Sequence, residues 1–220
     1  MKTKSSLFFL ASVMTVLIAC NAETQTDKAE TTEKQVAASS DGENYVVDTT
    51  ASKLEWFAAK QTGKHNGEFS IQDGSLSVNN GQLTGGKFDI NVAAIVVNDL
   101  QGEDKGKLEG HLKSPDFFQV EKFPGAKFEI TKVEVADSSA TSTMPGATHI
   151  ISGNLTLKDS TKNVTFPAKV NLDDTKVSAQ ADFAIDRTDW GLNYKGPNNP
   201  QDWFIKKEVK LKLDLVASKK

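Results

Sequence analysis

Few residues of this sequence have the types and spacing that catalysis requires. The three histidines, His65, His111 and His149, are not spaced four residues apart, and none lies next to a carboxylate in the spacing of a zinc site. The sequence contains no Gly-x-Ser-x-Gly motif, no glycine-rich phosphate loop and no cysteine placed as a nucleophile. We therefore expect a binding protein and not an enzyme, although a fold alone never excludes a grafted catalytic site.

The one cysteine, Cys20, follows a segment with the features of an export signal. Two lysines precede an apolar stretch, residues 7–18, that is too short to span a membrane stably. The residues Leu17-Ile18-Ala19-Cys20 resemble a bacterial lipobox, in which the cysteine becomes the diacylated first residue of the mature chain. We expect residues 1–19 to be a lipoprotein signal peptide and Cys20 to be lipidated. The alternative is an ordinary signal peptide cleaved after Ala19.

The segment after Cys20 has the composition of a linker. Residues 21–43 contain six acids, two lysines and no aromatic residue. Such a segment cannot bury enough apolar surface to offset the entropy lost on ordering. The sequence therefore predicts a lipidated cysteine and disordered linker over residues 20–43, followed by one domain over residues 44–217.

The charge of the chain limits its partners. The formal net charge is −3, and most of it lies in the acidic segment 21–43, so the predicted domain is nearly neutral. A nearly neutral domain lacks the basic surface that binds phosphate backbones. We expect no nucleic-acid partner.

Apolar residues alternate with polar ones from Tyr45 onward, which is typical of half-buried antiparallel strands. The clearest runs are 164–172, 177–185 and 209–217. Earlier runs begin at residues 54, 69, 76, 88, 128 and 151, with turn residues at 73–74, 79–81, 158–160 and 173–174. A change of phase between residues 130 and 133 predicts a β-bulge.

One segment is typical of a helix. Residues 104–114 carry Leu108 and Leu112 four residues apart and stop at Ser114-Pro115. Residues 136–147 have the composition of a long loop, and residues 191–202 that of a flap rich in Gly and Pro. About eight strands and one helix predict an all-β barrel or sandwich.

Several motifs follow one another along the chain. They are Tyr45-x-x-Asp48-x-x-x-Ser52-x-Leu54-x-Trp56, Gly67-x-Phe69, Ser114-Pro115-Asp116-Phe117-Phe118 running on to Phe123-Pro124-x-Ala126-x-Phe128, Gly153-x-Leu155-Thr156-Leu157, and Arg187-x-Asp189-Trp190-Gly191. In this order they resemble the motifs of the YceI-like family. The resemblance covers residues 45–217. It departs from the family at Asp159, where glycine is common, in the length of the 136–147 loop, and in the lipobox, which replaces the plain signal peptide of soluble members.

The resemblance implies an antiparallel, eight-stranded, lipocalin-like β-barrel with one short α-helix, in an envelope protein that binds polyisoprenoids. We therefore expect no catalytic cofactor. The expected bound group is a lipid ligand of the polyisoprenoid or quinone type. With Cys20 as the lipid anchor, the domain is expected on a membrane of the bacterial envelope, outside the cytoplasm. Oligomeric state, ligand headgroup and choice of membrane stay open.

Eight strands enclose an interior that is either filled by side chains or just wide enough for one slim ligand. Small residues on the dry faces, including Ala58 and Gly153, suggest space for a ligand. The Phe117-Phe118 pair could equally form a core plug or line the site. The residues expected to contact an apolar ligand are Trp56, Phe88, Phe117, Phe118, Phe128, Ala168, Ala179, Ala181, Phe183, Arg187 and Trp190.

Arg187 has two possible roles. It could donate hydrogen bonds to a ligand headgroup, or it could form an ion pair with Asp189 or Asp116, and we favour the ion pair because buried arginines are usually paired. Two classes of function also stay open. The first is a carrier of a long apolar molecule, and the second is a structural or interaction lipoprotein whose barrel is solid.

Overall fold

The structure is a computed structural model that describes residues 26–137, 144–195 and 205–220. Cys20 and the predicted signal peptide lie outside these residues, as do parts of the predicted loop and flap. The elements of the described residues are β1 Asp27–Lys28, β2 Glu30–Glu33, β3 Glu43–Val47, β4 Lys53–Lys60, β5 Gly63–Asn79, β6 Gln82–Val97, α1 Gly102–Lys113, β7 Gly125–Val135, β8 His149–Leu157, β9 Ser160–Leu172, β10 Lys176–Asp186, the 3-10 helix η1 Arg187–Trp190, and β11 Ile205–Lys219.

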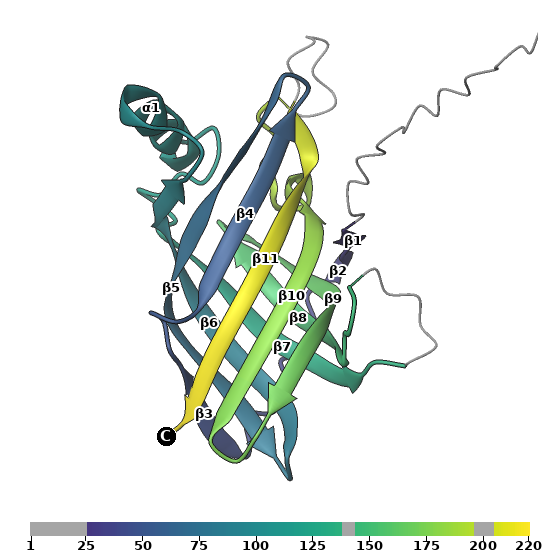
Figure 1. Ribbon diagram of the computed structural model, residues 1–220. Helices are drawn as coiled ribbons and strands as arrows, with labels where there is room; N and C mark the ends of the chain where they lie inside the picture. The colour runs from purple at the N-terminus through teal and green to yellow at the C-terminus, as the bar shows by residue number, and fades with distance from the viewer. Residues whose placement is uncertain (1–25, 138–143, 196–204) are drawn as a thin grey trace, which may run out of the picture.

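The longer strands close into an antiparallel barrel of eight positions (Figure 1). β5 to β11 follow one another around the barrel, and β3 and β4 together fill the position between β11 and β5. β3 pairs with β5 and β11 near the C-terminus, at the end called here the base. β4 pairs with the same two strands near the β4–β5 hairpin, at the end called here the mouth. The predicted all-β barrel with one short helix is confirmed.

Alternation along the strands places one face of each in the barrel interior, as the sequence predicts. Val164, Phe166 and Ala168 of β9 face the interior, and so do Ala181 and Phe183 of β10. Tyr45 is 1% exposed at the base, where its hydroxyl donates to the carbonyl oxygen of Asp173 at 3.2 Å. This contact closes the base with an aromatic ring whose polar end is satisfied.

The sequence predicted an interruption of the strand at one position in β5 and at one position in β7. The turn expected at Asp73-Gly74 is wrong, because β5 runs through it with only a shift of register between residues 71 and 73. Gly74 is needed there for close packing, since a Cβ atom would lie 2.8 Å from the ring of Phe88. The predicted bulge in β7 is confirmed by a register shift between Ile130 and Lys132.

The helix α1 lies at the mouth, against β6, close to the predicted bounds (Figure 1). The carboxylate of Glu109 accepts a hydrogen bond of 2.9 Å from the backbone N–H of Val97 at the end of β6. None of the helix residues is fully buried. The helix therefore rests on the barrel end through Leu108 and Leu112, which pack on Trp56 and its neighbours.

The segment predicted to be a disordered linker differs from that prediction in residues 27–40, called here the strap. β1 pairs with β10 in parallel and β2 pairs with β9 in the antiparallel sense, so one short stretch of chain bridges these two strands (Figure 1). Ala29, between β1 and β2, is 3% exposed and donates its N–H to the carbonyl oxygen of Ala184 at 2.8 Å. Pairing with strand edges supplies the stability that the composition of the strap lacks.

The strap then crosses the outer surface of the barrel toward the base. The side-chain amide of Asn154 on β8 donates to the carbonyl oxygen of Gln35 at 2.8 Å and accepts from the N–H of Gln35 at 3.0 Å. Asn163 donates to Asn154 at 3.1 Å, and Ala38 donates its N–H to the carbonyl oxygen of Ile130 at 2.9 Å. The strap thus covers two buried asparagines on the outer face, which would otherwise be open to water.

Candidate functional site

The lower part of the barrel holds an apolar cavity of about 100 Å³, called here the lumen. All residues that line it are apolar. They are Leu54, Ile71, Leu76, Leu83, Phe88, Ile90, Phe128, Ile130, Ile151, Leu155, Val164, Phe166, Ala168, Val170, Ala179, Ala181, Phe183, Leu211, Leu213 and Leu215. Without a donor or acceptor, the lumen can hold hydrocarbon but cannot orient a polar substrate.

Four phenyl rings form a row along the wall of the lumen. Phe88 and Phe128 lie 6.2 Å apart between ring centroids, and Phe128 and Phe166 lie 5.9 Å apart. Phe166 and Phe183 are stacked face to face with centroids 3.9 Å apart. These side chains come from β6, β7, β9 and β10, so the row lines one side of the interior.

The space expected beside Gly153 is filled. A Cβ atom at Gly153 would lie 2.2 Å from the ring of Phe128, so this ring occupies the volume that the missing side chain leaves. The sequence hypothesis that Gly153 leaves room for a ligand is therefore wrong, because its small size instead lets an aromatic ring pack across the strand. Ala168, Ala179 and Ala181 do line the lumen.

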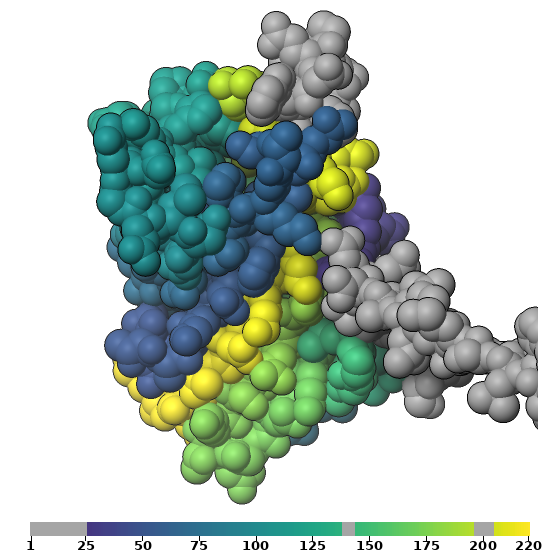
Figure 2. Space-filling model, turned by 45° about the horizontal axis from the view of Figure 1, so that its top comes forward, coloured from purple at the N-terminus to yellow at the C-terminus, as the bar shows by residue number. Residues whose placement is uncertain are grey.

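A second cavity of about 370 Å³, called here the mouth pocket, lies between α1 and the barrel end. Figure 2 shows the teal helix region beside the blue β4–β5 hairpin at this end. The residues lining it are Trp56, Ala58, Ala59, Lys60, His65, Phe69, Ile95, Leu108, His111, Leu112, Phe117, Phe118, Arg187, Leu192, Tyr194, Lys195, Ile205 and Val209. Its charged side chains are all basic, unlike the lumen.

Trp56 lies on the inward face of β4 and is 4% exposed. Its indole ring packs across Gly67 of the neighbouring strand, where a Cβ atom would lie 2.8 Å from the ring. Its indole N–H has no acceptor among the described residues. Trp56 follows Leu54, a lumen residue, on the same face of β4, so it stands between the two cavities.

Phe117 and Phe118 line the mouth pocket and not the lumen. Phe117 lies 5.2 Å from the rings of both His111 and Tyr194. Phe118 makes an edge-to-face contact with Phe69 at 5.7 Å. These residues form a plug under α1, and the plug also lines a cavity. The positions of Phe117 and Phe118 are therefore compatible with both predicted roles, core plug and lining of the site.

The two histidines of the mouth pocket each contact a carboxylate. His65 Nδ1 lies 2.9 Å from Asp99, and His111 Nε2 lies 2.9 Å from Asp116. Burial raises the pKa of Asp99, but hydrogen bonds from the N–H of Asn66 and from His65 outweigh it and leave the pKa below its ordinary value. Each pair holds its imidazole ring in place at the pocket wall.

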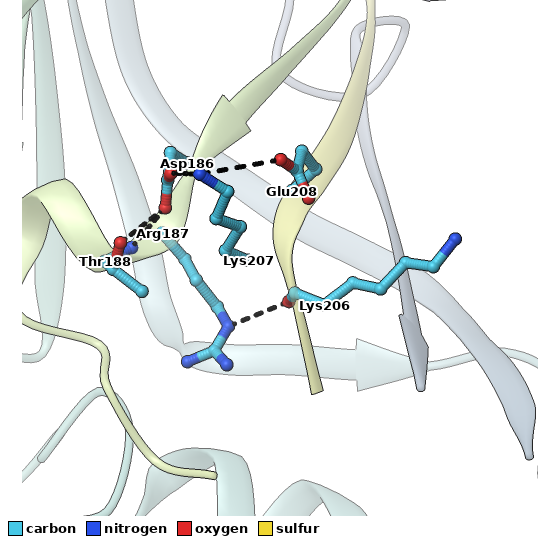
Figure 3. A network of polar contacts seen from close by, with 6 residues as sticks. All are labelled: Asp186, Arg187, Thr188, Lys206, Lys207 and Glu208. Carbon is cyan, nitrogen blue, oxygen red and sulfur yellow. Dashed lines mark hydrogen bonds and ion pairs between the residues drawn. The ribbon is translucent and has the colours of Figure 1, made fainter. Parts of the chain in front are cut away.

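Arg187 is 3% exposed, and its partners are backbone carbonyls. Its Nε donates to Lys206 at 3.1 Å, as Figure 3 shows, and its terminal nitrogens donate to Ile205 at 3.0 Å, to Tyr194 at 3.2 Å and to Leu192. The predicted ion pair with Asp189 or Asp116 is therefore wrong, because four carbonyl oxygens satisfy the guanidinium.

The guanidinium of Arg187 joins the chain on either side of residues 196–204. Burial lowers the pKa of Arg187 from its ordinary value, and the charge of Asp186 opposes this. The carboxylate of Asp186 itself points to Thr188 and Lys207 (Figure 3), whose Nζ lies 3.0 Å away. Arg187 is thus a structural clamp at the pocket wall.

Trp190 lies in the core and lines neither cavity. It is 1% exposed, and its indole N–H donates to the carbonyl oxygen of Leu155 at 2.9 Å. The hypothesis that Trp190 contacts a ligand finds no support in this position, since the bond to β8 fixes η1 to the barrel wall.

The predicted ligand residues thus fall into three groups. Phe88, Phe128, Ala168, Ala179, Ala181 and Phe183 line the lumen, Trp56, Phe117, Phe118 and Arg187 line the mouth pocket, and Trp190 lies outside both. The predicted ligand residues omit most aliphatic lumen residues, among them Leu211 and Leu215, although the alternating run 209–217 places both on one face. They also omit His111, which no periodic pattern marks.

The described residues contain no group of three or more His, Cys, Asp or Glu side chains that could hold a metal ion. None of the helices in the described part of the chain is long and apolar enough to cross a membrane.

Comparison with known proteins gives matches in both sequence and structure. The YceI-like domain model matches residues 45–217. A UPF0312 protein of Shewanella denitrificans is 33% identical over 128 residues, which cover 57% of this chain and 61% of that protein. The chain therefore spans about three fifths of the length of this curated relative.

Two solved structures share the fold. The crystal structure of Burkholderia cenocepacia BcnA matches with a TM-score of 0.59 and 20% identity, covering 78% of this chain and 99% of that chain. A polyisoprenoid-binding domain from Saccharophagus degradans, described as implicated in plant cell wall breakdown, matches with a TM-score of 0.57 and 16% identity, covering 80% and 98%. At these identities the likeness concerns the fold.

Proposed function

The chain belongs to the YceI-like domain family, and from this membership we propose that its barrel binds a long apolar ligand of the polyisoprenoid type and catalyses no reaction. The relative from Saccharophagus degradans is described as a polyisoprenoid-binding domain. The observation that carries the proposal is the lumen, whose lining is apolar throughout. Burial of hydrocarbon in such a cavity is favourable, whereas a polar substrate would lose its hydrogen bonds.

The two cavities follow one another along the barrel axis, which suits a long ligand. On β4, Leu54 lines the lumen and Ala58 lines the mouth pocket, on the same face. On β11, Leu211 lines the lumen and Val209 the mouth pocket. An extended chain in the lumen could thus continue past Trp56 and place its polar end among the basic residues of the mouth pocket.

A filled barrel is the second candidate, and the size of the lumen favours it. The lumen of about 100 Å³ is smaller than the roughly 300–1,000 Å³ of ordinary ligand pockets. The rings of Phe166 and Phe183, from β9 and β10, stack face to face at the lumen. Under the first candidate these rings move when the ligand binds, and under the second they form the permanent core of a structural lipoprotein.

Mass spectrometry of an organic extract of the purified full chain distinguishes the candidates. We expect a long isoprenoid lipid in a fixed ratio to protein, and the same lipid should return when delipidated protein is incubated with octaprenol. A protein that neither carries an extractable lipid nor takes up octaprenol would support the filled barrel.

Membrane attachment through Cys20 is a separate part of the proposal, supported by the lipobox-like sequence. We infer an envelope lipoprotein with its barrel outside the cytoplasm, because two acyl chains give stable anchoring where one gives only reversible binding. Cys20→Ser should abolish fatty-acid labelling and release the protein from membranes. Fatty-acid labelling that persists in Cys20→Ser would contradict this assignment. It would leave the proposal about the ligand unaffected.

A further inference from the structure

Among the described strands, the neighbours β9 and β10 pair directly over only part of their length, and the stretch where they do not is called here the seam. β9 and β10 are paired from Val177 with Leu172 as far as Ala181 with Ala168. Beyond that pair, toward the mouth, β9 pairs with β2 and β10 pairs with β1 instead. The strap therefore lies between two strands that have separated, as Figure 1 shows at the right of the barrel.

The lumen lies directly behind this seam. Val164 and Phe166 of β9 and Phe183 of β10, which flank the seam, all line the lumen. The stacked rings of Phe166 and Phe183 bridge the two strands on the inside. At the seam, the wall therefore combines this aromatic pair with the strap, whose Ala29 is buried in the same core cluster.

The strap is held by polar contacts more than by apolar burial. Ala29 is its one fully buried apolar residue, and Val36 is 89% exposed. Its polar contacts include strand pairing, the Asn154 amide, the hydrogen bond from Ala38 to Ile130, and an ion pair of 2.6 Å between Glu33 and Lys162, in which Glu33 is largely exposed. Segments with little buried apolar surface detach at a lower free energy than core strands.

The strap also lies outside the family domain, which matches from residue 45. Its later part is fixed to the barrel by Gln35 and Ala38, whereas its first part, Asp27–Lys28, ends on β10. Detachment from β10 can therefore start at the N-terminal end, with residues 33–35 as the hinge. This movement leaves the strands of the barrel in place.

We propose that the seam between β9 and β10 is the lateral portal through which the apolar ligand reaches the lumen, and that the strap closes it. This inference rests on the proposed lipid-binding function. A hydrocarbon crossing the seam meets the rings of Phe166 and Phe183 on the lumen side. Detachment of the strap leaves backbone N–H and C=O groups of β9 and β10 without strand partners, so this step is the barrier at the seam and controls ligand entry.

The experiment fixes the strap to β10 with a disulfide. Lys28 and Ala184 are partners in the β1–β10 register, and neighbouring strands lie within the Cα separation that a disulfide spans. Lys28→Cys with Ala184→Cys is made in the full chain carrying Cys20→Ser, and delipidated protein is mixed with octaprenol in detergent micelles. We expect the oxidised form to take up octaprenol about tenfold more slowly than the reduced form.

A matched control places a disulfide in a seam that is already paired. Glu55 on β4 and Lys212 on β11 are register partners and an ion pair at 3.6 Å, and their replacement by cysteines should leave the uptake rate unchanged on oxidation. A second variant, Ala29→Pro, removes the N–H that donates to Ala184 and should speed uptake several-fold.

Each outcome has a distinct meaning. Equal uptake by the oxidised and reduced Lys28–Ala184 pair, with no acceleration in Ala29→Pro, would overturn the portal and leave the mouth as the route. Slowing by both disulfides alike would also overturn it, since general stiffening would then explain the effect. No uptake in any form, including the unmodified chain, would instead refute the lipid-binding function on which the portal depends.

Discussion

Arg187→Met tests the assignment of Arg187 as a clamp. The change keeps an apolar stem of similar length but removes the donors to the carbonyls of Leu192, Tyr194, Ile205 and Lys206. Leu192 is 4% exposed, so its carbonyl loses its partner in a buried place, whereas Lys206 is exposed and can bond to water. An acceptor left unsatisfied in the interior costs about 1–3 kcal/mol.

One fully buried and two partly buried carbonyls give an expected loss of about 2–4 kcal/mol in the free energy of unfolding. For a chain of this size, that corresponds to a fall in Tm of roughly 5–15 °C. The measurement is thermal and urea unfolding of delipidated protein. Lys206→Met is the matched control, because it removes an exposed cation from the same strand and should change stability by less than about 0.5 kcal/mol.

Arg187→Lys refines the test. A lysine ammonium retains the charge but cannot reach four carbonyls with its three donors, so it should recover only part of the lost stability. The clamp assignment would be refuted if delipidated Arg187→Met were as stable as the unmodified chain while its lipid occupancy fell. That result would mean that the guanidinium serves a ligand headgroup.

Three other predictions follow from the packing and the charges. Ala179→Leu with Ala181→Leu should overpack the small lumen, lower stability by about 1–3 kcal/mol and abolish lipid uptake; retained lipid in a folded variant would place the ligand elsewhere. Gly153→Ala should displace the ring of Phe128 and lower Tm, and an unchanged Tm would contradict the packing found there. Burial raises the pKa of Asp186, but hydrogen bonds from Thr188 and Lys207 lower it overall, so its contribution to stability is present above about pH 4 and is lost below. Asp186→Asn should therefore be less stable than the unmodified chain at neutral pH, with the difference closing in acid, as melting curves at both pH values would show.

Period-two alternation predicted the barrel wall well, because inward and outward positions are a local property of a strand. It placed Ala168, Ala181 and Phe183 on one interior face, where they lie. Glycine was harder to interpret. Gly74 and Gly153 suggested a turn and an open space, but both are small because an aromatic ring from a neighbouring strand packs over them.

The strap and Arg187 show what local composition cannot reveal. Residues 27–33 lack the apolar side chains that order a segment by itself, and their partners are strands more than a hundred residues later in the chain. Arg187 was expected to meet a carboxylate because arginine needs acceptors, but the sequence does not indicate where backbone carbonyls converge. In both cases the partner is a backbone group. Residue types in the sequence do not indicate where such backbone groups lie in the fold.

The strap also bears on the solubility of the chain. Without it, the N–H and C=O groups of β9 and β10 at the seam would form two facing strand edges with no partners, and such edges recruit strands from other molecules. The lipocalin-like barrel is usually regarded as edge-free by closure, yet this one owes part of its closure to a polar segment outside the family domain. A chain that begins after residue 42 would expose that edge permanently, so it should self-associate through β-pairing even while its barrel remains folded.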